Sequence, residues 1–148
     1  MIVKLMPEMT LAFLFTEDKV FGDTQMNEFL TTIGSNPEAT KKYFFRITAR
    51  QRATIKITYA LYAIVPEGTK GKGKITIVNL PSGEYLMFTM SKHEFDDVNS
   101  GADEKIGAAA KEWLKEHNRN FDMRNIFGLV EEDFIDGYEM YNLYFPIK

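Results

Sequence analysis

The stretches Thr58–Pro66 (TYALYAIVP) and Tyr138–Pro146 (YEMYNLYFP) decide the fold, because each closes one half of the chain with the same pattern. Aromatic and apolar residues recur in both stretches, in runs typical of a β-strand, and both stretches end in proline. Each stretch therefore predicts a strand. Their likeness predicts a chain that is built from two related halves.

A second match, at the beginning of each half, supports this repeat. Five apolar residues align in order with five others: Ile2, Val3, Leu5, Leu11 and Phe13 with Ile77, Val78, Leu80, Leu86 and Phe88. Two matches in the same order are stronger evidence for an internal repeat than either match alone. We therefore expect a single domain over residues 1–148, with internal halves of about 1–73 and 74–148.

Each half also contains one amphipathic helix. In the first half, apolar residues recur at helical spacing from Met26 to Ile33. Asp23 or Thr24 can cap the exposed amides at the start of this helix, and Gly34 can adopt the left-handed conformation that ends it.

The helix of the second half is the clearest element of the sequence. Its apolar stripe consists of residues at helical spacing: Ile106, Ala109, Ala110, Trp113, Leu114 and His117. Ser100 with Asp103 resembles a capping box at its start. His117, near the end, is expected to be a cation at the negative end of the helix dipole, and His93 a solvated loop residue.

The remaining runs are rich in β-branched and aromatic residues or alternate with a period of two, and they predict strands. They are Met9–Phe15, Tyr43–Thr48, Thr54–Val65, Lys74–Leu80, Gly83–Met90, Asn125–Val130 and Tyr138–Phe145. Each half therefore has the order strand, helix, strand, strand, which predicts the fold class α+β. The segment Pro66–Lys74, with three glycines and three lysines, is expected to be a flexible connector between the halves. It lacks the Walker pattern of a phosphate loop.

Composition excludes several classes of protein. The 148 residues include 45% hydrophobic residues, no cysteine and two histidines, and the formal net charge is −3. The absence of cysteine excludes disulfide scaffolds and thiol nucleophiles, and two histidines cannot form a three-histidine metal site. We expect no metal, no cofactor, no direct contact with nucleic acid and no membrane segment, in a soluble cytoplasmic protein.

Aromatic residues on the strands are the most informative candidates for a binding site. In Thr58–Pro66, Tyr62 points away from Tyr59 and Leu61, and in the last strand Met140, Asn142 and Tyr144 share one face. A tyrosine suits a ligand cavity, because its ring stacks on planar or cationic ligands while its hydroxyl keeps a polar partner. The alternative, which stays open, is that these residues belong to the core or to an interface.

One acidic stretch, Glu131–Gly137, holds four carboxylates and a turn glycine. It lacks the ligand spacing of a calcium loop, so the preferred interpretation is a hairpin connection. Its carboxylates would still lend negative potential to a nearby cleft.

The second half resembles a known family. The run Leu80–Phe88 (LPSGEYLMF), the helix with Glu112–Leu114 (EWL) and the closing Leu143–Ile147 (LYFPI) are similar to the GyrI-like (gyrase-inhibitor-like) effector-binding family. This resemblance implies two pseudo-symmetric βαββ units (SHS2 modules), which form an antiparallel sheet with helices on one face and a ligand cleft between the halves. The candidate ligand-binding residues are Tyr62, Tyr85, Trp113, Met140, Asn142 and Tyr144. The helical stripe places Trp113 at the helix–sheet seam, near the pocket floor, where plain packing is the preferred alternative.

The family also implies roles. Its members are drug-sensing domains of transcription regulators, stand-alone multidrug binders and, in one branch, hydrolases. Many of them use a buried glutamate in the pocket. The chain carries Asn142 where that glutamate is frequent, which leaves Glu139, on the opposite strand face, as the candidate catalytic carboxylate.

Three functions follow as hypotheses. The first is a stand-alone binder of a lipophilic or aromatic drug-like molecule, cationic ligands included, linked to transcriptional regulation or drug sensing. The second is a hydrolase of strained or toxic small molecules that uses the same cleft. The third is a protein-interaction module, whose partner is another protein or a second copy of the chain.

Overall fold

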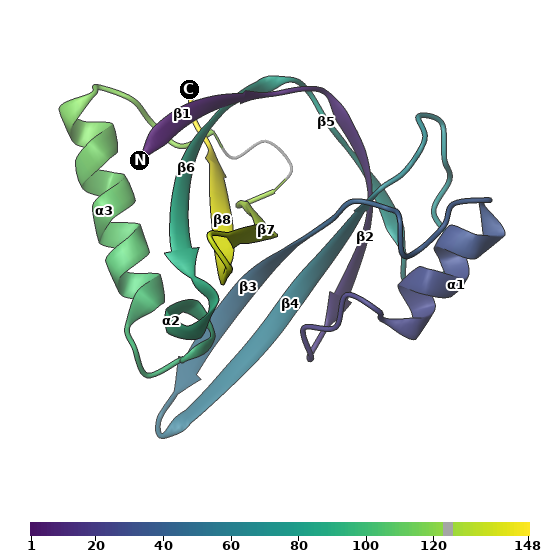
Figure 1. Cartoon of the computed structure of the whole chain (residues 1–148), viewed down its shortest axis with the longest axis horizontal. Helices are drawn as coiled ribbons and strands as arrows, with labels where there is room; N and C mark the ends of the chain where they lie inside the picture. The colour runs from purple at the N-terminus through teal and green to yellow at the C-terminus, as the bar shows by residue number, and fades with distance from the viewer. Residues whose placement is uncertain (123–125) are drawn as a thin grey trace. The chain divides into compact units, whose positions relative to one another are not determined.

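The computed structural model describes residues 1–122 and 126–148 and has the predicted α+β fold of antiparallel strands and helices. Its contacts divide the chain into two compact units. Unit 1 comprises Met1–Pro7 and Ser82–Lys148, and unit 2 comprises Glu8–Pro81. Each unit is a four-stranded antiparallel sheet that carries its helices on one face (Figure 1).

Unit 1 contains four strands and two helices in its described residues. Its sheet has the order β1 (Ile2–Met6), β6 (Gly83–Ser91), β8 (Tyr138–Pro146), β7 (Leu129–Ile135). Between β6 and β7 the chain forms the short helix α2 (Lys92–Asp96) and the longer helix α3 (Ala102–Glu116).

Unit 2 repeats this plan. Its sheet has the order β5 (Thr76–Leu80), β2 (Met9–Thr16), β4 (Thr54–Ile64), β3 (Lys42–Gln51), and its helix is α1 (Thr24–Thr32). The equivalent strands therefore occupy equivalent places in the two sheets, as the internal repeat predicts.

The edge strands are exchanged between the two sequence halves. β1 precedes β2 in the chain but pairs with β6, from Ile2 opposite Met87 to Met6 opposite Gly83. β5 precedes β6 but pairs with β2. The chain passes between the units immediately after Pro7 and after Pro81. The units thus differ from the halves 1–73 and 74–148 by one strand each.

This exchange corrects the expectation that Pro66–Lys74 is a flexible connector between the halves. The segment joins β4 to β5 inside unit 2. Its backbone is held by hydrogen bonds from Thr69 to Pro66 and, in both directions, between Lys72 and Ile75. Gly71 is required there, because a Cβ atom at this position would lie 2.5 Å from the carbonyl oxygen of Ile75.

Both predicted helices are present. The side chain of Asp23 caps α1 by accepting hydrogen bonds from the amides of Gln25 and Met26, and Gly34, at a φ of 82°, follows its end. α3 begins differently from the expected capping box, because its N-cap is Gly101 in the left-handed conformation. Ser100 instead donates from its hydroxyl to the carbonyl of Glu94 and so ties α3 to α2.

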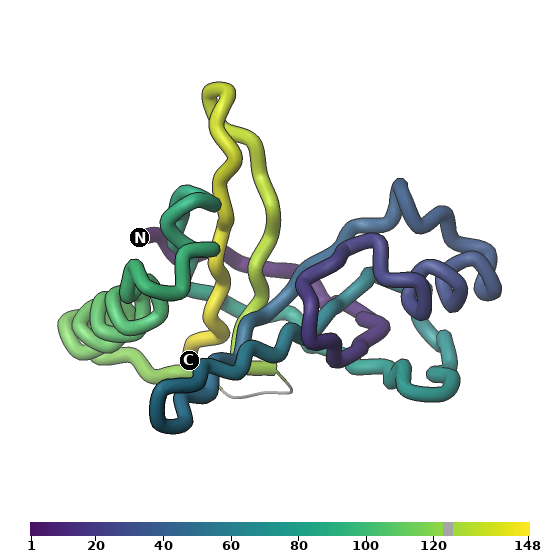
Figure 2. Tube along the Cα trace, turned by 90° about the horizontal axis from the view of Figure 1, so that it is seen from below, coloured from purple at the N-terminus to yellow at the C-terminus, as the bar shows by residue number. Residues whose placement is uncertain are grey.

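Three further expectations need correction. The strand expected at Asn125–Val130 is β7, which begins only at Leu129 and continues through the acidic stretch to Ile135; Asn125 itself lies outside the described residues. The hairpin connection is real but consists of the tight turn at Asp136 and Gly137, which both have positive φ. Figure 2 follows β7 and β8 along this hairpin. His93 belongs to α2 and not to a loop.

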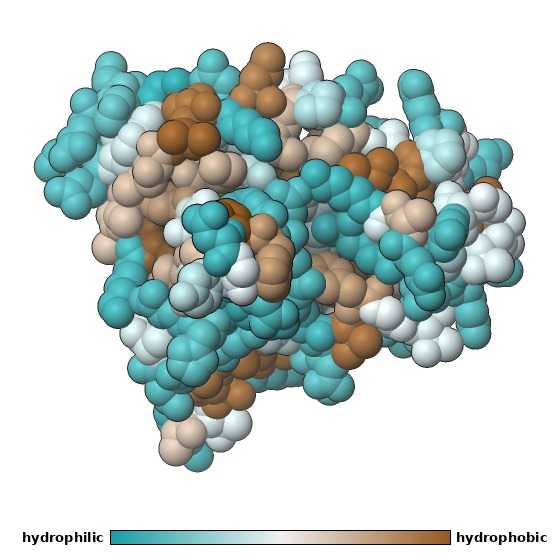
Figure 3. All heavy atoms as spheres, in the orientation of Figure 1, coloured by the Kyte–Doolittle hydropathy of each residue, from teal (hydrophilic) through white to brown (hydrophobic). Residues whose placement is uncertain are grey.

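Apolar side chains between helix and sheet form a core in each unit. In unit 2, Met26, Phe29 and Leu30 of α1 pack on Ala12, Leu14 and Ala63 of the sheet. In unit 1, Ala110 and Leu114 of α3 pack on Leu86 and Ile147. On the surface seen in Figure 3, apolar residues form separate patches among polar ones. Among the described residues, no helix combines the length and the apolar character that crossing a membrane requires.

Candidate functional site

The sheet of unit 1 has two different faces. Side chains alternate along each strand, and directly paired residues share a face. On the face towards the helices, Tyr141 contacts Phe95 of α2 through an edge-to-face ring pair and donates its hydroxyl to Asp96. The opposite face we define as the helix-free face of unit 1. Its residues include Ile2, Lys4, Tyr85, Met87, Thr89, Leu129, Glu131, Asp133, Tyr138, Met140, Asn142 and Tyr144.

Four of the residues predicted for the binding site lie together on the helix-free face. They are Tyr85, Met140, Asn142 and Tyr144. Tyr85 and Tyr144 are buried, and Asn142 is only 6% exposed. The alternation of β8 was sufficient to predict this grouping of Met140, Asn142 and Tyr144.

Asn142 is the centre of a polar network on this face. Its carbonyl oxygen accepts a hydrogen bond from the Thr89 hydroxyl at 2.8 Å. Its amide nitrogen donates to Asp133 at 2.9 Å and to Glu131 at 3.3 Å. The hydroxyl of Tyr144 donates to the same Glu131 oxygen at 3.0 Å. A buried amide is costly unless it is satisfied, and this network satisfies both ends of the Asn142 side chain.

The two carboxylates of this network were missed as site residues by the sequence reasoning. That reasoning placed Glu131 and Asp133 in a hairpin connection, whereas they lie on β7 opposite Asn142 and Met140. The available signal was the alternation Leu129, Glu131, Asp133, which continues the strand into the acidic stretch. The face therefore holds two carboxylates beside an aromatic ring, although Asn142 stands where the family often has a glutamate.

A lysine adds a positive charge to the helix-free face. The Lys4 ammonium lies 5.5 Å from the centroid of the Tyr144 ring, within the range of a cation–π contact. Tyr144 is thus contacted by a cation on its ring and by the carboxylate of Glu131 at its hydroxyl.

Tyr62 lies in unit 2. It points to the face of that unit's sheet that is turned away from α1. On β4 it stands between Phe13 and Tyr43 on the neighbouring strands, and its ring stacks on Phe13 with 5.2 Å between centroids. Burial disfavours the charged phenolate and raises the pKa of Tyr62 to about 12. The hydroxyl of Tyr62 therefore stays neutral across the physiological range.

Trp113 lies on the other side of the sheet from Tyr85 and Tyr144. Its half-buried ring packs beside Leu86 and Leu114 in the core under α3. Its other partner is His117, whose ring stacks on it at 3.9 Å and whose Nδ1 lies 2.8 Å from the Trp113 carbonyl oxygen. These contacts describe a residue at the helix–sheet seam, as the helical stripe predicts.

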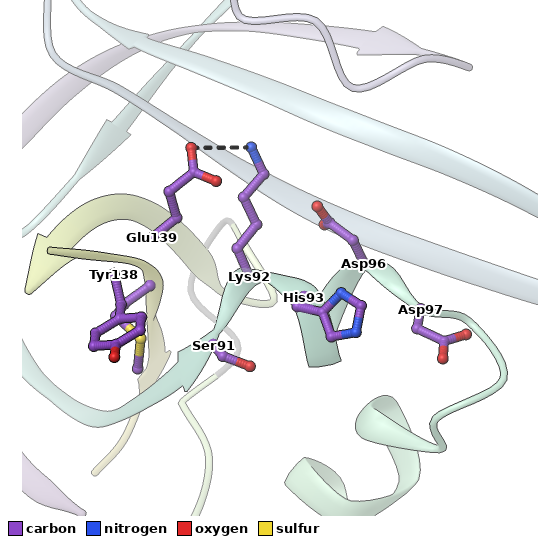
Figure 4. Close-up of a pocket in the computed structure, with 8 residues that line it drawn as sticks. Ser91, Lys92, His93, Asp96, Asp97, Tyr138 and Glu139 are labelled. Atoms are coloured by element: carbon purple, nitrogen blue, oxygen red, sulfur yellow. Dashed lines mark ion pairs between the residues drawn. The ribbon is translucent and has the colours of Figure 1, made fainter.

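Glu139 lies apart from the Asn142 network. Its side chain points to the same face of β8 as that of Tyr141, as expected. It borders a hollow of about 680 Å³ between α2 and the beginning of β8. Figure 4 shows Lys92 and Glu139 directed towards one another across this hollow, with a distance of 3.9 Å between Nζ and Oε1. The Glu139 side chain is 67% exposed, and Met140 is the predicted binding residue that also lines the hollow.

Acidic residues are frequent in this unit. Within the described residues, no cluster of three or more histidine, aspartate or glutamate side chains has a geometry that could hold a metal ion.

Comparisons with known proteins identify the fold. No family model matches the chain, and no curated protein matches it in sequence. The crystal structure of the EcmrR C-terminal domain matches with a TM-score of 0.57 and 13% identity, over 99% of this chain and 96% of that chain. EcmrR in a complex with DNA matches with a TM-score of 0.60 and 11% identity, over 99% of this chain.

This chain spans only 56% of the EcmrR chain in that complex, about half of its length. SAV2435 bound to tetraphenylphosphonium is a weaker match, with a TM-score of 0.47 and 11% identity over 99% of this chain and 92% of that chain. At these identities the likeness to EcmrR concerns the fold alone. It supports the GyrI-like fold that the sequence resemblance implies.

Proposed function

We propose that the protein binds a small lipophilic cation on the helix-free face of unit 1. The observation that carries this proposal is the contact between Tyr144 and Glu131, where an aromatic ring and a carboxylate lie side by side. An aromatic ring attracts a cation through its electron-rich face, and a partly buried carboxylate attracts it through its full charge. Asp133 adds a second carboxylate through Asn142.

The chemistry of the face supports a lipophilic ligand in particular. Met87, Met140 and Leu129 lie on the same face as the polar network. A ligand site of this kind combines apolar walls with a few well-placed polar groups. Methionine suits ligands of varied shape, because its side chain is unbranched and polarisable.

We further propose that this binding serves transcriptional regulation or drug sensing. The support for this role is the resemblance to GyrI-like effector-binding proteins and the likeness in fold to the C-terminal domain of EcmrR, a protein solved in a complex with DNA. The described residues are occupied by the two sheets and their helices. We therefore propose the ligand-binding role for this chain.

Binding of tetraphenylphosphonium and of its anionic isostere tetraphenylborate, measured by calorimetry, tests the proposal. The parent is expected to bind the cation more tightly than the anion. Glu131→Gln keeps the hydrogen-bonding shape but removes the charge, and it is expected to weaken cation binding at least about tenfold, or ~1.4 kcal/mol. Glu132→Gln is the matched control, because this neighbour points to the other face of β7. Equal losses in both variants, or no binding by the parent, would refute the proposed site.

The protein-interaction hypothesis is supported by a different part of unit 1. Phe134 and Tyr138, near the turn between β7 and β8, are 68% and 72% exposed, and the stretch carries several carboxylates. Exposed apolar residues with a polar rim are a common feature of interaction surfaces. The variant Phe134→Ser separates the two functions, since Phe134 lies on the other face of β7 from Glu131 and Asp133 and the variant is expected to retain binding of tetraphenylphosphonium.

A further inference from the structure

The helix-free face already holds a cation from its own chain. Lys4 is the single charged residue of β1, in the sequence Ile2–Met6 (IVKLM). It pairs with Tyr85 on β6, and its side chain crosses that strand diagonally to place its ammonium over the ring of Tyr144 on β8. β1 comes from the other half of the sequence, so the strand exchange is what delivers this charge to the face.

The position of this charge matters for any ligand that stacks on Tyr144. Two cations held at one aromatic ring repel one another, and each competes for the same electron-rich face. Lys4 is exposed, and its flexible four-carbon stem allows the ammonium to leave the ring for water. The contact is therefore reversible and weak enough for a ligand to displace.

The same charge balances the face when no ligand is bound. Glu131 and Asp133 both accept hydrogen bonds from Asn142 and so concentrate negative charge around one amide. A lysine at Tyr144 offsets part of this charge. A lipophilic cation would take over that role when it replaces the lysine.

We propose that Lys4 is a built-in competitor that determines the ligand specificity of the site. It occupies the cation position on Tyr144 in the free protein and has to swing away before a ligand cation can stack there. Lys4 consequently lowers the affinity for lipophilic cations and raises the affinity for lipophilic anions. This inference rests on the function proposed above and assigns Lys4 a role within that site.

The experiment compares Lys4→Met with Lys111→Met in the otherwise complete chain. Methionine keeps an unbranched apolar side chain as far as Cε and removes the charged amine. Lys111, on the exposed side of α3, controls for the change in net charge. We expect Lys4→Met to bind tetraphenylphosphonium about three- to tenfold more tightly than the parent and tetraphenylborate more weakly. Lys111→Met is expected to match the parent with both ions.

The outcomes separate this inference from the proposed function. If Glu131→Gln weakens cation binding while Lys4→Met binds both ions as the parent does, the site stands and the role of Lys4 is refuted. If Lys4→Met strengthens the binding of both ions, it acts by opening space and not through charge, which also refutes the inference. Opposite shifts for the two ions, absent in Lys111→Met, support it. If neither the parent nor Lys4→Met binds the cation, both the site and the role of Lys4 are refuted.

Discussion

Titration of Tyr62 provides a quantitative test of its burial. Its pKa is raised to about 12 by burial, against an ordinary value near 10. A raised pKa in the folded state means that the stabilising contribution is complete below pH 10 and is lost as the pH rises through about 12. The full difference of about two pKa units corresponds to ~2.7 kcal/mol of unfolding free energy. At pH 11, midway through this window, about half of it, or ~1.4 kcal/mol, has been lost.

The assay is urea unfolding of the parent and of Tyr62→Phe between pH 8 and pH 11.5. Phenylalanine retains the stacking on Phe13 but cannot ionise. We expect the parent to lose stability relative to Tyr62→Phe above pH 10, by about 1.4 kcal/mol at pH 11. Tyr138→Phe is the control, because the Tyr138 ring is 72% exposed. Parallel pH profiles for the parent and Tyr62→Phe would refute the argument that the folded sheet buries this hydroxyl.

Three further substitutions test the site from different sides. Trp113→Ala is expected to cost about 2–4 kcal/mol in chemical unfolding while tetraphenylphosphonium affinity stays unchanged, because the ring packs under α3; retained stability with lost binding would place it in the site. Asn142→Ala is expected to cost about 1–3 kcal/mol, since it removes the shared amide from Glu131 and Asp133, and an unchanged melting temperature would contradict the network. Glu139→Gln is expected to alter neither stability nor any turnover of strained-ring substrates, and parent turnover abolished in this variant would establish the hydrolase instead.

Local patterns predicted the elements of this fold well. The apolar spacing from Met26 to Ile33 and the capping residue Asp23 are sufficient to define α1, because helix periodicity and capping are local properties. The likeness between Thr58–Pro66 and Tyr138–Pro146 corresponds to β4 and β8, which occupy equivalent places in their sheets. The motif resemblance implied the same fold without reference to packing.

Strand pairing could not be predicted from the same patterns. β1 and β5 are similar in sequence, and each is apolar enough to pair with either β2 or β6. The choice depends on contacts that are distant in the sequence, and so the exchange at Pro7 and Pro81 was not foreseen. For the same reason Pro66–Lys74 was expected to connect the halves, although a loop rich in glycine and lysine also suits a turn within one unit.

The site residues on β8 could be predicted from the sequence. Those on the neighbouring strands β7 and β1 could not. Alternation alone grouped Met140, Asn142 and Tyr144, and it separated Glu139 from them. Glu131 and Asp133 were assigned to a loop, because four carboxylates in a short stretch indicate a solvated connection more often than a strand. Lys4 was not considered, since its place over Tyr144 follows from the exchanged strand.

The most direct measurement of the central claim is the location of a bound lipophilic cation. Nuclear Overhauser effects between the phenyl protons of tetraphenylphosphonium and the side chains of the labelled protein report which face it contacts. We predict contacts to the ring of Tyr144 and to the methyl group of Met87, with loss of the contact between Lys4 and Tyr144. Contacts to Trp113 or to His93 in the hollow beside α2, with Tyr144 unaffected, would contradict this claim.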